Sequence, residues 1–231
     1  PTTLAFARDG YGEDDVRFFP IDPTLITQGR NTIGVEVHQT DPASDDLTFF
    51  ATVVAYDAAS PTTTTTTTTT PATTVPGTTV PGTTAPTTTV VAPPSGRIDV
   101  ASDAVWSYLD NGSDQASSWT SATYDDSTWK TGVGEFGYGD GDERTVVSYG
   151  PSANPKYTTT YFRHRFAASG VPDDLTLRLR VDDGAVAYLN GVEVARFNLP
   201  SGPVSVLTRA PDAISGPDER LNRPFTVDPS L

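Results

Sequence analysis

Two short segments of this sequence concentrate carboxylates next to glycine. The first contains Asp140, Asp142 and Glu143, and the second contains Asp182 and Asp183. Carboxylates this close repel one another unless a cation or a hydrogen-bond donor relieves the repulsion. A site rich in oxygen ligands suits a hard cation such as calcium. Both segments are therefore candidate calcium sites; the alternatives are a solvated loop for the first and a turn into a strand for the second.

Aromatic residues suggest a second kind of chemistry, which is stacking on sugars. Tyr138 lies in the same Gly/Asp-rich stretch as the first acidic segment, so its ring is the candidate for packing on a sugar ring. Trp106 and Trp129 are expected in the core, because burial in a core is the commoner fate of tryptophan. The candidate ligand-binding residues are Tyr138, Asp140, Asp182 and Asp183, and the candidate metal ligands are Asp140, Asp142 and Glu143.

Catalytic machinery is sparse in the sequence. His38 and His164 are the two histidines, and there is no cysteine. The Gly-x-Ser-x-Gly elbow, the His-Glu-x-x-His pair and a phosphate-cradling loop do not occur in the sequence. Paired carboxylates are common in an acidic chain, so they do not by themselves identify a glycosidase. We therefore predict that the chain is not an enzyme.

The charge balance excludes several classes of partner. The chain has 231 residues, with 15 Lys and Arg against 29 Asp and Glu, and a formal net charge of −14. Nucleic acid is not expected as a partner, because phosphate binding needs a basic face. Attraction to an anionic membrane surface is excluded on the same ground. The sequence contains no run of about 18 apolar residues, so insertion into a bilayer is not predicted.

A low-complexity segment divides the chain. Residues 58–96 contain an unbroken threonine run from Thr62 to Thr70, followed by proline-spaced threonine units, and no charged residue. Such a segment has too few large apolar side chains for a core, and regular proline blocks helices and sheet ladders. Tracts of this composition are typical of linkers in exported proteins. We predict a disordered linker between residues 1–57 and 97–231.

Short strands are expected on both sides of the linker. Residues 175–181 alternate Leu or Val with Thr or Arg, which is the period of a half-buried strand. Residues 185–197 form a hairpin, because Asn190 and Gly191 tolerate the positive φ angles of a type I′ turn. The sequence shows no amphipathic helix of more than about three turns. An all-β protein with a β-sandwich is therefore predicted, with further strands at 32–37, 47–54, 105–109 and 158–166.

One sequence segment occurs twice. Residues 10–25 and 216–231 align without gaps, with Arg17 matching Arg223 and Phe19 matching Phe225. A shared Asp-Pro step within the alignment argues against chance similarity. We infer that one type of module occurs twice. Residues 1–57 are then the C-terminal part of one copy, and residues 97–231 are a copy that lacks its last strands.

Several motifs together resemble a known family. They are Tyr-Leu-Asp-Asn-Gly at 108–112, Tyr-Asp-Asp-Ser-Thr-Trp at 124–129, Phe-Gly-Tyr-Gly-Asp at 136–140, and Asp-Asp-Gly at 182–184 followed by Tyr-Leu-Asn-Gly at 188–191. In this order they resemble the galactose-binding-like jelly-roll modules of bacterial secreted multidomain proteins. Those modules accompany metallophosphoesterase, lamin-tail and spore-coat-kinase-like domains. The 182–191 stretch is also similar to a sandwich domain whose lectin members chelate calcium through paired aspartates.

The resemblance implies a jelly-roll β-sandwich in a secreted or cell-surface bacterial protein. The preferred function is a non-catalytic accessory module that binds carbohydrate or a cell-wall polymer. One alternative is a structural spacer that packs against an adjacent enzyme domain of the parent protein. Another is a piece of an enzyme whose active residues lie outside this sequence. Calcium is the one cofactor that the acidic segments and the resemblance bring forward.

The position of the missing strands leads to a prediction about closure. A sandwich without them would leave an open edge, which is costly and prone to aggregation. The strands exist at the other end of the chain, and closure entropy grows slowly with loop length. We therefore predict closure as a circular permutant, with Val35 and Val37 pairing with residues 97–231. One copy of the repeat must then be displaced to the surface. The competing outcome is a cut from a tandem array, in which other sequence completes each half.

Overall fold

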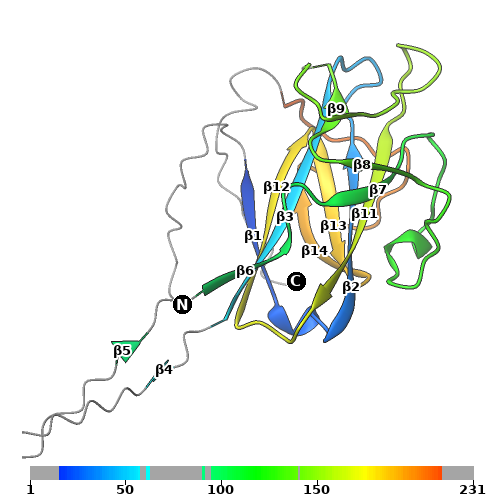
Figure 1. Ribbon diagram of the computed structural model, residues 1–231. Helices are drawn as coiled ribbons and strands as arrows, with labels where there is room; N and C mark the ends of the chain where they lie inside the picture. The colour runs from blue at the N-terminus through cyan, green and yellow to red at the C-terminus, as the bar shows by residue number, and fades with distance from the viewer. Residues whose placement is uncertain (1–15, 58–60, 63–89, 92–94, 140, 215–231) are drawn as a thin grey trace, which may run out of the picture.

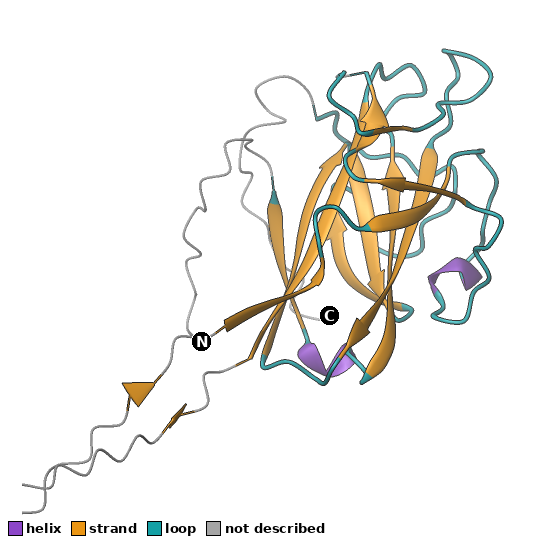
Figure 2. Cartoon of the chain, in the orientation of Figure 1, coloured by secondary structure: helices purple, strands orange, loops and turns teal. Residues whose placement is uncertain are grey.

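The computed structural model describes residues 16–57, 61–62, 90–91, 95–139 and 141–214. Within them the protein is all-β, as Figures 1 and 2 show, and it contains two six-stranded sheets. Apolar side chains from both sheets meet in one core between them, so this part of the chain is a β-sandwich. None of its helical turns is long and apolar enough to cross a membrane. The predicted disorder of the linker falls mostly outside the described residues.

The two sheets are named here after their central strands. The β3 sheet has the order β1 (Arg17–Ile21), β12 (Asp174–Asp182), β3 (Leu47–Asp57), β9 (Phe136–Tyr138) and β10 (Thr145–Val146), with β6 (Ser95–Val100) also paired to β3. The β2 sheet has the order β14 (Val192–Phe197), β13 (Gly184–Leu189), β2 (Gly29–His38), β11 (Thr159–Ala168), β7 (Val105–Leu109) and β8 (Lys130–Val133). Two further short strands, β4 (Pro61–Thr62) and β5 (Val90–Val91), pair with each other.

The alternation seen in the sequence decides which side chains enter the core. In β12 the residues Leu175, Leu177 and Leu179 are buried between the sheets, as a period of two requires. The hairpin of β13 and β14 is also confirmed. Its turn residues Asn190 and Gly191 have φ angles of 53° and 91°, which are the two positive angles of a type I′ turn.

The predicted pairing across the linker is confirmed. Val35 of β2 lies opposite Phe162 of β11 on one side and Ala187 of β13 on the other. Strand β3 pairs with β12, β9 and β6. Strands from both sides of residues 58–96 therefore build one sandwich, as Figure 1 shows by the blue and cyan strands among yellow and green ones.

The structure shortens the predicted linker at one end and gives one copy of the repeat a place in the sandwich. The linker was predicted to extend to residue 96, but Ser95 and Gly96 already belong to β6 and lie opposite Asp57 and Tyr56. Strand β6 is thus a further partner of β3. Composition alone does not reveal this pairing. Of the two repeat copies, the first contributes β1 beside β12. The second copy, residues 216–231, lies outside the described residues.

Candidate functional site

The outer face of the β2 sheet contains buried charged side chains. Alternate residues of β2, such as Val35, point into the core between the sheets, so Glu36 and His38 point to the opposite face. There Glu36 is 4% exposed and His38 is 0% exposed. Burial on an outer face requires a cover, and two loops, residues 110–129 and 198–214, supply it.

Arg163 of β11 holds the 110–129 loop in place. The Arg163 side chain is fully buried. Its Nε donates to Oδ2 of Asp126 at 3.1 Å, and its Nη2 donates to the carbonyl oxygen of Ser121 at 3.0 Å. Its Nη1 contacts the carbonyl oxygen of Trp119. Burial lowers the pKa of Arg163, and the hydrogen bond to Asp126 opposes that effect, so the buried charge is compensated.

Trp119 belongs to the 3-10 turn η2 (Ser118–Thr120) and packs over Gly34 of β2. A Cβ atom at Gly34 would lie 2.7 Å from Cζ3 of Trp119, so a glycine is needed for this approach. The ring of Trp119 meets Tyr161 and Tyr188 edge-on, with ring centroids 5.1 Å and 5.5 Å away. These aromatic contacts form one wall beside Glu36.

Backbone carbonyls attach the 198–214 loop to polar side chains of the sandwich. Three of them accept hydrogen bonds of 2.7–2.8 Å: Thr208 from His38 Nδ1, Val206 from Thr159 Oγ1, and Ala210 from Thr40 Oγ1. At its end, the backbone N–H of Ile214 donates to Oδ1 of Asp183 at 2.7 Å. The loop is therefore fixed at several points along its length.

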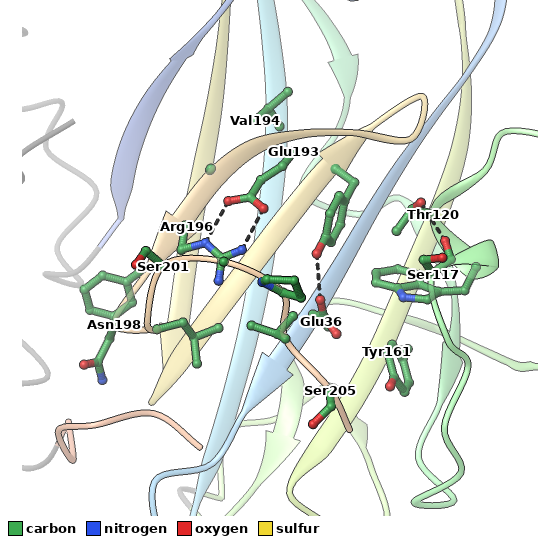
Figure 3. Close-up of a pocket in the computed structure, with 18 of the residues that line it drawn as sticks. Glu36, Ser117, Thr120, Tyr161, Glu193, Val194, Arg196, Asn198, Ser201 and Ser205 are labelled. Carbon is green, nitrogen blue, oxygen red and sulfur yellow. Dashed lines mark hydrogen bonds and ion pairs between the residues drawn. The ribbon is translucent and has the colours of Figure 1, made fainter. Parts of the chain in front are cut away.

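A groove of about 1060 Å³ lies between these coverings. Its lining includes Glu36, Tyr161 and Tyr188 from the sheet, and Glu193 and Arg196 from β14. In Figure 3, Glu36 lies between the Glu193–Arg196 pair and Tyr161. The groove also extends to β1 residues 18–20 and to the start of the 198–214 loop.

Glu36 is the central acceptor of the groove. Its Oε1 accepts a hydrogen bond of 2.9 Å from the Tyr188 hydroxyl, and its Oε2 lies 3.4 Å from Nε2 of His38. Burial raises the pKa of both Tyr188 and Tyr161, and the negative charge of Glu36 raises each further. Both phenols therefore keep their protons at neutral pH and can act as hydrogen-bond donors.

Arg196 and Glu193 form a bidentate ion pair at the opposite wall. Nε and Nη2 of Arg196 each donate to a carboxylate oxygen of Glu193 at 2.7 Å. The hydrogen bond to Glu193 is the largest cause that raises the pKa of Arg196. A planar, two-point pair of this kind has a fixed orientation, so it presents charge to the groove without free rotation.

The tyrosine that the sequence suggested as a ligand contact has a different environment. Tyr138 is part of the main core. Its hydroxyl accepts a hydrogen bond of 3.0 Å from Nε2 of Gln39, and its ring meets Tyr149 with centroids 5.5 Å apart. The burial expected for Trp106 and Trp129 is confirmed, with Trp106 in the main core and Trp129 beside Trp119.

The acidic pair of the sequence is buried at the other end of the 198–214 loop. The two oxygens of Asp183 accept backbone hydrogen bonds of 2.7 Å, one from Thr40 and one from Ile214. Asp182 is 5% exposed. Burial first, and then the charge of Asp183, raise the pKa of Asp182 to about 10. Backbone N–H donors thus stabilise the Asp183 side chain, and a bound proton neutralises Asp182 at neutral pH.

The other acidic segment is only partly visible. Asp140 lies outside the described residues. Asp142 is exposed, and Glu143 accepts a hydrogen bond of 3.1 Å from the backbone N–H of Gly141. In the part of the chain that the structure describes, no group of three or more His, Asp or Glu side chains is arranged to hold a metal. Of the acidic residues that the structure describes in these two segments, none lines the groove.

Sequence reasoning did not single out the groove residues. A usable signal existed at Glu36, a carboxylate inside a strand whose neighbours Val35 and Val37 are apolar. Glu193 and Arg196 give no such signal, because residues three apart in a regular strand face opposite sides; they meet where the pairing of β13 with β14 shifts register. The pattern at Glu36 does not say that two distant loops cover the sheet face at this point.

Comparisons with known proteins add no assignment: no family model, no curated protein and no solved structure matches this chain.

Proposed function

We propose that this chain is a non-catalytic accessory module of a secreted or cell-surface bacterial protein, and that the groove binds carbohydrate or a cell-wall polymer. The finer fold assignment that goes with this proposal is a jelly roll of the galactose-binding-like type. The single observation that supports it most is the set of oriented polar groups around Glu36 in a groove of about 1060 Å³.

The chemistry of the lining fits a polyhydroxylated ligand. Sugar hydroxyls both donate and accept hydrogen bonds, and the groove offers carboxylates at Glu36 and Glu193 and donors at Arg196 and Tyr161. Aromatic side chains with a polar end suit ligands that are apolar on one face and wet on the other. The formal net charge of −14 favours a neutral over an anionic polymer.

Titration calorimetry against a panel of soluble polysaccharides and solubilised peptidoglycan tests this proposal. The informative variant is Tyr188→Phe, which removes the hydroxyl that orients Glu36 and keeps the ring. We expect a loss of affinity of about 5- to 150-fold, because a mispaired polar group in a binding site costs about 1–3 kcal/mol. The matched control is Tyr138→Phe, which likewise removes a tyrosine hydroxyl, at the ligand contact predicted from the sequence.

The results separate the groove from the sequence-predicted contact. Loss of binding in Tyr138→Phe with unchanged binding in Tyr188→Phe would place the ligand elsewhere. Absence of binding across the whole panel would instead favour the spacer.

A further inference from the structure

Strand β1 contacts the sandwich through alternate residues. Phe19 and Ile21 are buried in the main core. The guanidinium carbon of Arg17 lies 3.6 Å from the centroid of the Phe197 ring, which is a cation–π arrangement. Pairing in register with β12 places Phe19 opposite Leu177.

The turn after β1 is held by its own side chains. Asp22 caps the 3-10 turn η1 (Pro23–Leu25), and its Oδ1 accepts hydrogen bonds from the backbone N–H and the hydroxyl of Thr24 at 2.9 Å and 2.7 Å. Leu25 then packs against the core. The element therefore has a defined set of contact positions from Arg17 to Leu25.

The second repeat copy preserves that set of positions. The identical pairs are Arg17/Arg223, Phe19/Phe225, Asp22/Asp228, Pro23/Pro229 and Leu25/Leu231, and the conservative pairs are Ile21/Val227 and Thr24/Ser230. Each retains the property that the contact uses, namely a cation, an apolar side chain, a capping carboxylate or a hydroxyl. Residues 223–231 thus encode the contact surface of residues 17–25.

The two mismatches fall at positions that face outward. Phe18 corresponds to Pro224 and Pro20 to Thr226, and both Phe18 and Pro20 are exposed. A proline is tolerated in a strand where its missing N–H would point away from the neighbouring strand. Residues two apart in a strand share this direction, so a proline at position 18 also leaves the pairing with β12 intact.

The second copy is also within reach. Ile214 is buried in the main core and lines the same groove as β1 residues 18–20. The eight residues 215–222 separate it from Arg223, and such a chain can span up to about 26 Å. A segment tethered this closely has an effective concentration in the millimolar range.

We propose that the edge of β12 is a strand-exchange site, at which residues 223–231 of the same chain can replace residues 17–25. Exchange keeps the core contacts and changes the outward residues, so that Pro224 and Thr226 replace Phe18 and Pro20 at the end of the groove. The proposal does not depend on what the groove binds.

A double-mutant cycle on the full chain tests the exchange. Phe19→Asp disables the first copy, Phe225→Asp disables the second, and the third variant carries both changes. If the copies substitute for each other, Phe225→Asp alone shifts Tm by less than about 2 °C, and Phe19→Asp alone causes a moderate decrease. The double variant should then fall at least about 5 °C below the sum of the single effects. Additive effects would overturn the proposal.

Disulfide trapping gives a second readout in case Phe19→Asp folds poorly. Arg178 lies opposite position 18, so Arg178→Cys with Pro224→Cys in the Phe19→Asp chain should form an intramolecular disulfide. The natural chain has no cysteine, which leaves one thiol pair. Arg178→Cys with Phe18→Cys in the otherwise natural chain is the matched control. A disulfide-linked dimer would identify a second copy as the occupant and overturn the proposal, as would failure to cross-link when the control does.

Discussion

The hydroxyl of Tyr188 donates a hydrogen bond of 2.9 Å to Glu36, although 152 positions separate the two residues in the sequence. They meet because β2 and β13 are neighbours in one sheet, while residues 58–96 lie between them in the chain. The groove therefore exists only when both flanks of that segment have folded together. Its integrity and the stability of the sandwich are linked.

Removing this hydroxyl should lower stability as well as ligand affinity. Tyr188→Phe leaves a buried acceptor on Glu36 without its donor, so we expect the free energy of unfolding to fall by about 1–2 kcal/mol. Urea denaturation measures the change. The control Tyr149→Phe, at an exposed ring, should stay within about 0.5 kcal/mol of the natural chain. Equal losses in the two variants would contradict the assigned role of the bond.

The contact between Gly34 and Trp119 predicts a strong effect of one methyl group. In Gly34→Ala the new Cβ would meet Cζ3 of Trp119 at 2.7 Å, so the ring must move and the 110–129 loop must shift. We expect the free energy of unfolding to fall by about 1–3 kcal/mol, as for overpacking in other cores. The tryptophan fluorescence should change as well. Gly170→Ala is the matched control, because a Cβ atom there meets nothing within 4 Å.

Asp182 predicts a dependence of stability on pH. Its pKa is raised to about 10 in the folded chain, first by burial and then by Asp183, whereas an unfolded aspartate has a pKa of about 3.9. Between these values the folded chain holds a proton that the unfolded chain releases. The contribution of Asp182 to the free energy of unfolding is therefore greatest below about pH 4. That contribution is lost as the pH rises toward 10.

The measurement compares unfolding free energies between about pH 5 and pH 9. Asp182→Asn should flatten this dependence and be more stable than the natural chain at the alkaline end. The exposed Asp103→Asn is the control and should keep the natural slope. Parallel curves for Asp182→Asn and the natural chain would show that Asp182 does not retain its proton.

Calcium remains a prediction for the Asp140, Asp142 and Glu143 segment and for the Asp182–Asp183 pair. A cation that binds only the folded chain raises Tm by mass action. If calcium binds at the first segment, Asp142→Asn combined with Glu143→Gln should abolish the rise in Tm that millimolar calcium produces in the natural chain. A Tm that is the same in calcium and in chelator would remove calcium from both segments.

Several features of the fold could be predicted from local sequence patterns, and one from strands that part of the sequence lacks. The hairpin turn follows from Asn190 and Gly191, and the inward face of β12 follows from its alternating leucines. The pairing of β2 with the far segment could also be predicted, because a sandwich without those strands would have an open edge. These features follow from the period of a strand, from the backbone preference of a turn, or from strands missing in one part of the chain.

The candidate site could not be read in the same way. Alternation places Glu36 and Val35 on different faces of the sheet, but it does not reveal that residues 110–129 and 198–214 cover the face of Glu36. Tyr138 illustrates the converse, since its Gly/Asp-rich neighbourhood suggested a ligand contact, and its ring lies in the core. Strand period by itself determined which side chains share a face. Only the tertiary structure decided which faces are covered, because burial on an outer face depends on contacts between residues far apart in the chain.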